Sequence, residues 1–221
     1  LGQVNSLHFD TCDLEEHARS DAGDSAKDKI RIRWYGQEYD PHLTFGDWAA
    51  SDDPLVAVWL ERKTRRGFAS TKQRVTVDVP ASALSFRALP RGIVPPAFLM
   101  GTMAGFGFFL RGRLCPVIAI SYRRYRFVEP CTAFRISIDS HIRSSAVMPG
   151  IGRGERGLEL PGAVVEVKGP VYALPDTLRP LGDIGSSWTR YSKYASSLDG
   201  HMAVPGSVSR LWPSGTMERL S

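Results

Sequence analysis

The chain has 221 residues, 43% hydrophobic and 23% charged, so it is long enough for a real core and too apolar for a disordered protein. Its 28 Lys and Arg residues against 23 Asp and Glu residues give a net charge of +5, which is compatible with a phosphate-rich partner. Cys12, Cys115 and Cys131 are widely spaced and form no CxxC motif or Cys/His cluster. This spacing disfavours a zinc site and a disulfide framework and favours a reducing compartment.

The sequence predicts no membrane span and no signal peptide. The longest apolar run, 97–110, is shorter than the about 20 residues that cross a bilayer, and it is followed by Arg111. We interpret this run as a buried helix. The N-terminus has no basic region and no cleavage pattern, so a cytoplasmic location is expected.

Short segments rich in β-branched and aromatic residues predict antiparallel strands. They lie at 4–10, 29–35, 55–63, 71–79, 117–122, 124–128, 133–139 and 164–168. Helices are predicted at 81–89, 97–110, 174–181 and 188–198, with a short helical piece after residue 14. We therefore expect an α+β fold with a large antiparallel sheet or barrel over residues 1–198. The Gly, Pro and Ser content of 199–221 predicts a loosely held tail.

The most informative segment is 29–36, KIRIRWYG. Lys29, Arg31 and Arg33 alternate with apolar residues, so on a strand the three cations share one face. Like charges on one face repel one another unless an anion or carboxylates neutralise them. One strand of this kind is equally typical of the solvated outer face of an antiparallel sheet.

The same alternation of charged residues recurs in other predicted strands. It places on common faces the pairs and triplets Glu61/Lys63, Lys72/Arg74, Arg124/Arg126, Arg135/Ser137/Asp139 and Glu166/Lys168. Such repetition indicates either a closed sheet with a basic interior or a flat sheet with one wet face. Periodicity alone does not distinguish these two arrangements.

The order of KIRIRWYG, LERK, STK, YRRYRF, FRISID, VVEVK and RYSKY resembles the vacuolar transporter chaperone (VTC) domain. This is the catalytic domain of polyphosphate polymerases, within the triphosphate tunnel metalloenzyme superfamily. The opening VNSLHFDTCDL resembles the SxYFDT strand of that family, with His8 where the family usually has Tyr. The resemblance covers residues 4–194.

The resemblance implies an antiparallel β-barrel tunnel of about eight strands with helices packed outside. It implies transfer of the ATP γ-phosphate to a growing polyphosphate chain, with Mg²⁺ or Mn²⁺ and release of ADP. ATP and polyphosphate are therefore the expected partners, together with a membrane-embedded partner of the kind some family members use; nucleic acid is not expected. The family has a basic strand upstream of the SxYFDT strand, and the sequence here starts at Leu1, so an incomplete barrel is also expected.

The resemblance also implies roles for individual residues. The catalytic cations, which bind phosphate, would be Arg31, Arg33, Lys63, Arg124 and Arg135. Further phosphate-binding residues would be Lys29, Lys72, Lys168 and Lys193, and the metal ligand would be Glu166. These residue types suit phosphoryl transfer, which needs cations that hold phosphates in line and neutralise developing charge.

Other interpretations remain open at the level of sequence. Glu61 and Asp139 are expected to pair with neighbouring Arg and Lys residues rather than with a metal, and Arg74 and Arg126 are candidates for outer-surface charges. A tunnel-fold hydrolase and a non-catalytic module that binds polyphosphate or inositol phosphates are alternative functions. Nucleic-acid binding would require an exposed basic face and a steep salt dependence.

Overall fold

A computed structural model describes residues 1–36, 53–67, 69–109, 112–151, 157–169, 175–183 and 191–203. The strands are β1 (Gly2–Thr11), β2 (Ala26–Tyr35), β3 (Leu55–Arg66), β4 (Ala69–Pro80), β5 (Leu114–Val128), β6 (Arg135–Ala146), β7 (Leu158–Leu160) and β8 (Val164–Lys168). The α-helices are α1 (Glu15–Asp21), α2 (Pro96–Gly105) and α3 (Lys193–Met202), and the 3₁₀ helices are η1 (Ala81–Leu84), η2 (Leu89–Arg91) and η3 (Asp176–Gly182).

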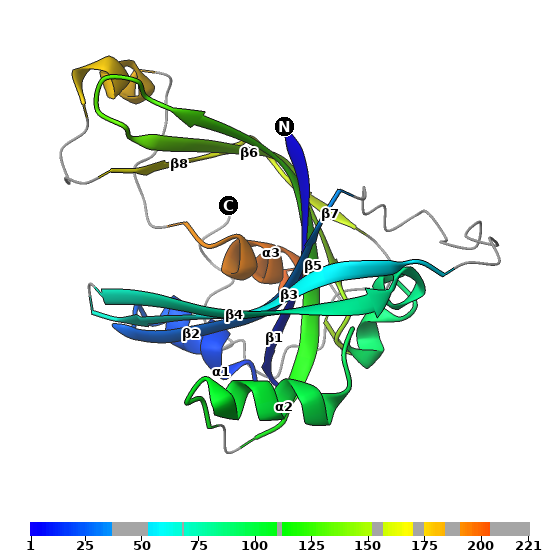
Figure 1. Cartoon of the computed structure of the whole chain (residues 1–221). Coiled ribbons are helices and arrows are strands. Elements are labelled where there is room, and N and C mark those ends of the chain that lie inside the picture. The colour runs from blue at the N-terminus through cyan, green and yellow to red at the C-terminus, as the bar shows by residue number, and fades with distance from the viewer. Residues whose placement is uncertain are drawn as a thin grey trace.

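The strands form one antiparallel sheet in the order β4-β3-β2-β1-β5-β6-β7, with β8 also paired to β6. The α+β class and the large antiparallel sheet are therefore confirmed. The predicted closed barrel is not confirmed, because within the described ranges the pairing ends at β4 on one side and at β7 and β8 on the other. The sheet instead curls into two walls, β2–β4 and β6–β8, on either side of β1 and β5 (Figure 1).

The outer face of the sheet carries the larger core. Leu7, Ile32 and Leu60 are cross-strand neighbours with no exposed surface, which follows from their alternation with polar residues on β1–β3. The segment of η1, η2 and α2 covers them, with Leu89 and Met103 in the same cluster. On β1–β3 this core therefore fixes which face is left for the charged residues that line the other side.

Helix α2 differs from the predicted buried helix. It runs over Pro96–Gly105, and Leu99 and Met103 are its buried side chains, while the helical residue Phe98 is 42% exposed. The helix lies on the outside of the sheet. Only Leu99 and Met103, four residues apart on one side of the helix, therefore reach the core, although the whole segment is apolar. Within the described residues, no helix is long and apolar enough to cross a membrane.

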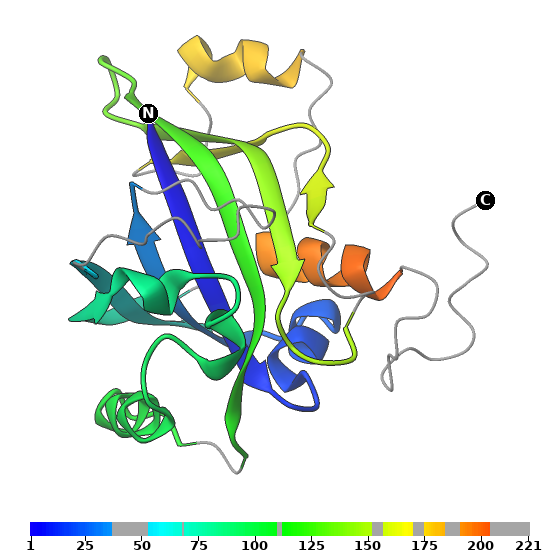
Figure 2. The ribbon, with the colours of Figure 1, turned by 90° about the vertical axis from the view of Figure 1, so that its right-hand side faces the viewer.

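A second core lies on the inner face, where α3 packs. Tyr194 and Leu198 of α3 contact the cluster formed by Ile118, Ile120 and Ile142 of β5 and β6. The helix begins with Ser192 as its N-cap, whose Oγ accepts a hydrogen bond from the Ala195 amide at 3.3 Å. In Figure 2 the orange helix α3 lies beside α1 and below β6.

Several predicted elements have different bounds in the structure. The segments 117–122 and 124–128 belong to the single strand β5, and 81–89 forms η1 and η2 rather than one helix. The segment predicted as a helix at 174–181 is the 3₁₀ helix η3, which contains Pro180. Helix α3 continues to Met202, past the predicted end of the domain at residue 198, and 204–221 lie outside the described residues.

Candidate functional site

Strand register aligns the predicted basic residues in rows across β2–β4. Residues directly opposite each other in a ladder point to the same face. One row contains Lys29, Lys63 and Lys72, and the next contains Arg31, Glu61 and Arg74. The alternation seen in the sequence therefore produces one continuous charged face on this wall.

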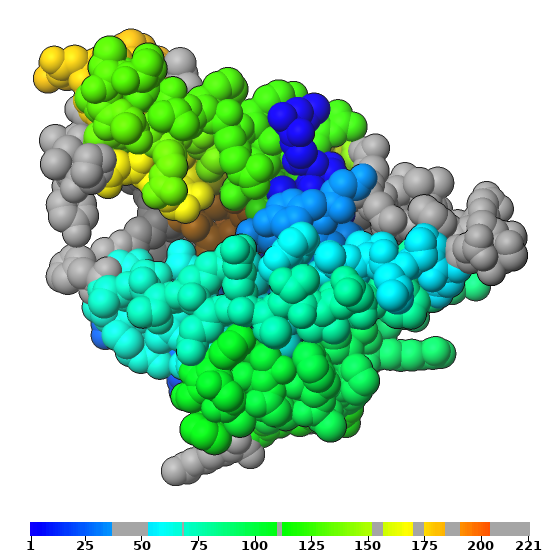
Figure 3. All heavy atoms as spheres, in the orientation of Figure 1, coloured from blue at the N-terminus to red at the C-terminus, as the bar shows by residue number. Residues whose placement is uncertain are grey.

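The same face continues through β1 and β5 onto the second wall. Arg33 is opposite Ser6 of β1, and Arg124 of β5 is opposite Gly2. The rows that join β5 to the second wall are Arg124/Asp139 and Arg126/Ser137/Glu166, and Arg135/Lys168 is a row within that wall. Figure 3 shows the molecule hollowed between the two walls, with atoms of α3 at the back of the hollow. We call this hollow the cleft.

Glu61 is the centre of the first charge cluster. Its Oε2 lies 2.8 Å from Nη2 of Arg31 and 4.0 Å from Nη1 of Arg33, and its Oε1 pairs with Lys72. Burial alone would raise the pKa of this carboxyl, but the charge of Arg31 and the hydrogen bond from Lys72 outweigh it and lower the pKa. Glu61 therefore pairs with Arg31 and Lys72 and orients them, as expected from the sequence.

Asp139 is the centre of the second charge cluster, and it is fully buried. Arg124 donates two hydrogen bonds to it, from Nε at 2.5 Å and from Nη2 at 2.7 Å, and Lys193 Nζ lies 2.6 Å from Oδ2. The hydrogen bonds to Asp139 raise the pKa of Arg124 above its ordinary value. Asp139 therefore holds one cation from β5 and one from α3 in the same place.

Glu166 differs from the other two carboxylates because its side chain is 41% exposed. Lys168 Nζ lies 3.0 Å from Oε1, and Arg124 Nη2 lies 4.0 Å from Oε2. Among the described residues there is no group of three or more His, Cys, Asp or Glu side chains that could hold a metal ion. One exposed carboxylate would fit a Mg²⁺ or Mn²⁺ ion whose other ligands are phosphate oxygens and water.

The two walls face each other closely enough for their charges to interact. Burial lowers the pKa of Lys63 on β3, and the positive charge of Lys168 on β8 is the next largest cause. Lys29 donates a hydrogen bond from Nζ to Ser192 Oγ at 2.8 Å. Burial, followed by the charges of Lys63 and Arg31, lowers the pKa of Lys29 to about 8. These cations repel one another in the absence of an anion.

The remaining predicted residues lie at the margins of this face. Arg135 is exposed at the start of β6, opposite Lys168. Arg74 is opposite Glu61, and Arg126 is opposite Ser137, so the register places both on the face of the cleft rather than on the outer surface.

Comparison with known families agrees with this geometry. The profile of the VTC domain matches residues 2–199. The chain belongs to the VTC domain family. No curated protein matches the chain. VTC domains are associated with polyphosphate metabolism, so this VTC domain has a polyphosphate-related function.

The VTC domain places in the cleft two residues that the sequence did not predict, Tyr122 and Ser6. Arg124 and Lys193 lie over the ring of Tyr122, at 5.2 and 5.0 Å from its centroid. Arg33 donates hydrogen bonds to Tyr122 Oη at 3.4 Å and to Ser6 Oγ at 3.3 Å. Tyr122 precedes Arg124 by two residues on β5, and this spacing was the signal available in the sequence.

His8, which replaces the usual family Tyr, is a packing residue in this VTC domain. Its ring stacks on Tyr194 with centroids 5.3 Å apart. Burial and the charges of Arg31 and Lys29 lower the pKa of His8 well below its usual value, so the ring is neutral at pH 7. It therefore adds no charge to the cleft.

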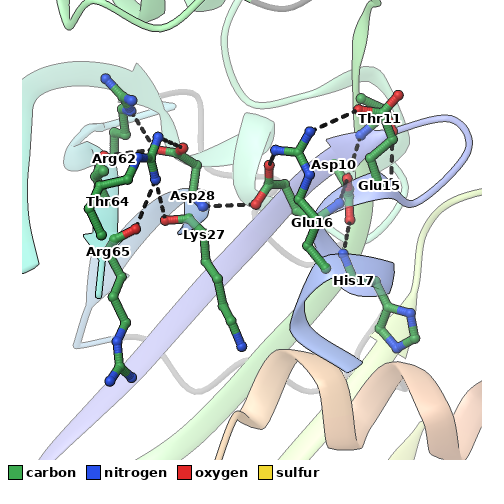
Figure 4. A network of polar contacts seen from close by, with 12 residues as sticks. Asp10, Thr11, Glu15, Glu16, His17, Lys27, Asp28, Arg62, Thr64 and Arg65 are labelled. Atoms are coloured by element: carbon green, nitrogen blue, oxygen red, sulfur yellow. Dashed lines mark hydrogen bonds and ion pairs between the residues drawn. The ribbon is translucent and has the colours of Figure 1, made fainter. Parts of the chain in front are cut away.

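A separate network, which we call the base network, positions α1 and α3 of the VTC domain. It consists of the buried carboxylates Asp10, Glu16 and Asp28 and their partners (Figure 4). Asp10 accepts hydrogen bonds from the His17 amide at 3.0 Å and from Tyr194 Oη at 2.7 Å. Tyr194 follows Lys193 directly, so this network fixes the cation that α3 contributes to the cleft.

Proposed function

We propose that this VTC domain is an ATP-dependent polyphosphate polymerase, which transfers the ATP γ-phosphate to a growing polyphosphate chain and releases ADP. The observation that carries the proposal is the convergence of cations from both walls on one cleft in which they outnumber the carboxylates. Arg31 and Arg33 come from one wall, Arg135 and Lys168 come from the other, and Arg124 comes from β5 between them. On this proposal the cleft acts as a tunnel for the polymer, on the cytoplasmic side where ATP is supplied.

The arrangement supports phosphoryl transfer because this reaction depends on positioning and charge neutralisation. Arg31 and Arg124 are each held by a buried carboxylate, so their guanidinium groups need little reorganisation when phosphates bind. Lys193 is a point charge fixed by Asp139, and Lys72 is one fixed by Glu61. These residues would bind and align the triphosphate and the end of the polymer.

Glu166 is the proposed ligand of a divalent metal. Its exposed carboxylate lies between Lys168 and Arg124, next to the cations that would hold phosphates. A bound Mg²⁺ or Mn²⁺ would add further neutralisation of negative charge on the phosphate oxygens.

The experiment is incubation of the purified protein with ATP and Mn²⁺, followed by measurement of polyphosphate, ADP and orthophosphate. Polymer with equivalent ADP is expected. Arg124→Ala should abolish the polymer, whereas Arg87→Ala should not, because Arg87 is exposed between η1 and η2. Absence of polymer and of ATP turnover would contradict the proposal.

A non-catalytic polyphosphate-binding module is the second candidate. The observation in its favour is that Glu61 and Asp139 are both occupied by cations, which leaves Glu166 as the carboxylate with exposed surface in the cleft. Tight binding of tripolyphosphate without turnover, unchanged in Glu166→Ala, would favour this candidate. Release of orthophosphate without polymer would instead indicate a hydrolase.

A further inference from the structure

Two cysteines that are far apart in the sequence meet at the end of the sheet where β1 ends and β5 begins. Cys12 follows β1, and Cys115 lies on β5, where it is opposite Asp10 in the antiparallel ladder. Their Sγ atoms are 2.7 Å apart, although 103 positions separate them in the chain. The spacing of cysteines in the sequence gave no sign of this pair, because only strand pairing brings them together.

The pair opens onto a pocket of about 340 Å³ that is distinct from the cleft. Its lining includes both cysteines, Arg91, Arg113 and the apolar residue Leu99. A pocket of this size accommodates a small molecule, and the two guanidinium groups favour an anionic one. Cys12 is exposed, and Cys115 is partly exposed, so both sulfur atoms are accessible from this side.

We propose that Cys12 and Cys115 form a reversible thiol–disulfide site that reacts with small anionic disulfides such as glutathione disulfide. The Cys12 thiolate attacks one sulfur of the small disulfide, forms a mixed disulfide and releases one thiol. The Cys115 sulfur, after losing its proton to solvent, then attacks Cys12 Sγ and releases the second thiol. The protein loses two hydrogen atoms, and the small disulfide is reduced to two thiols.

The environments of the two sulfur atoms assign the order of attack. Cys12 is the more exposed of the two, so it is the sulfur that an incoming disulfide reaches first. Burial, together with the neighbouring Cys12, raises the pKa of Cys115 to about 11, which keeps this thiol protonated and slow to attack an external disulfide. Once the mixed disulfide has formed, the proximity of Cys115 makes the second step intramolecular.

The cross-link would join the turn after β1 to the first residues of β5. A disulfide that closes a loop of this length restricts the unfolded chain, so the oxidised protein should have a Tm higher by several degrees, up to roughly 10 °C. The lining of this pocket contains none of the cations of the cleft, so tripolyphosphate affinity should stay within about twofold. The inference is therefore independent of the proposed function.

The test is treatment of the reduced protein with glutathione disulfide, followed by intact mass and peptide mapping under non-reducing conditions. The expected product is a single 12–115 cross-link, reversed by dithiothreitol, in the unsubstituted protein and equally in Cys131→Ser. Cys115→Ser should stop at the mixed disulfide on Cys12. No cross-link, a cross-link that contains Cys131, or a stable mixed disulfide in the unsubstituted protein would overturn the proposal.

Discussion

The cleft and the base network are both built around three carboxylates, and they differ in what surrounds those carboxylates. In the base network, Asp10 is held by the amides of Thr11, Glu16 and His17 and by the Tyr194 hydroxyl. In the cleft, each carboxylate is held by Lys or Arg side chains instead. The first arrangement satisfies Asp10 with backbone amides, although Asp28 of the same network also pairs with Arg62 and Arg66. The second brings in more positive charge than it neutralises.

This difference separates stability from binding. Removing a carboxylate from the base network leaves buried amide donors without an acceptor, which is costly for folding. A cation of the cleft already competes with like charges, so its removal relieves repulsion as well as breaking a pair. We therefore expect substitutions in the base network to lower mainly the free energy of unfolding, and substitutions in the cleft to weaken mainly tripolyphosphate binding. Four predictions test this comparison.

The largest effect is expected for Asp10→Ala. Its carboxylate accepts from the Thr11 amide at 2.7 Å and from the amides of Glu16 and His17 at 3.0 Å, in a site without solvent exposure. The free energy of unfolding, measured in urea, should fall by at least about 3 kcal/mol. Asp13→Ala, an exposed carboxylate in the same turn, should change it by less than about 0.5 kcal/mol. Equal losses in the two variants would remove the basis of the comparison.

The second prediction compares Arg62 with Arg31: Arg62→Ala should mainly affect stability, and Arg31→Ala should mainly affect binding. Arg62 pairs with Asp28 at 2.8 Å and donates to the Phe106 carbonyl at 2.5 Å, so Arg62→Ala should lower the free energy of unfolding by about 2–4 kcal/mol. Arg31→Ala should lower it by about 1 kcal/mol or less, because Arg33 and Lys72 still pair with Glu61.

Tripolyphosphate binding should show the reverse order. Calorimetry should give about a 10- to 100-fold weaker affinity for Arg31→Ala and a change within about twofold for Arg62→Ala. The measurements belong at a temperature at which both variants are folded. Equal loss of affinity in the two variants would show that the cleft and the base network are not separate units.

The third prediction concerns the metal. Glu166→Gln should keep or slightly increase tripolyphosphate affinity without metal, because it removes a negative charge beside Lys168. The gain in affinity on adding Mn²⁺ should fall by about tenfold, since the variant lacks the carboxylate ligand. Glu159→Gln is the matched control, because Glu159 is also exposed and paired to an arginine, Arg143, but lies on β7. An unchanged Mn²⁺ effect in Glu166→Gln would exclude Glu166 as the ligand.

The smallest effect is a pH dependence from Lys29. With a pKa of about 8, this side chain is mostly charged at pH 7 and mostly neutral at pH 9. Because an anion favours the charged form, tripolyphosphate binding at pH 8–9 should take up a fraction of a proton, and affinity should fall a few-fold as the pH rises. Calorimetry in buffers of different ionisation enthalpy measures this uptake. Lys29→Met should remove it, and persistence of the uptake in that variant would assign it elsewhere.

The alternation of residues was enough to predict which residues share a face on each strand. Lys29, Arg31 and Arg33 share the face expected from their spacing, and so do Glu166 and Lys168, whereas the rows across strands come from the register. The outer core followed from the same pattern, since Ile30 and Ile32 occupy the positions between the cations. A periodicity of two fixes faces without any knowledge of which strands are neighbours.

Contacts between distant elements could not be predicted in this way. The pairing of Asp139 with Lys193 depends on where α3 packs, and no local pattern in 193–202 specifies that place. The approach of Lys63 to Lys168 depends on the curl of the whole sheet. The burial of α2 was overestimated for a similar reason, because the composition of an apolar helix does not say how many of its faces are covered.

A strand that carries cleft residues on one face and core residues on the other limits where the chain can gain or lose residues. On β2, each cation of the cleft is followed by a core residue, as Arg31 is by Ile32. A deletion of one residue inside such a strand would exchange the two faces beyond it and bring charged side chains into the core. Deletions of two residues would preserve the faces but shift the rows by one step, so Lys63 would no longer be opposite Lys29. Changes in length are therefore tolerated in the connections between strands, and the spacing within each strand is as much a part of the site as the cations themselves.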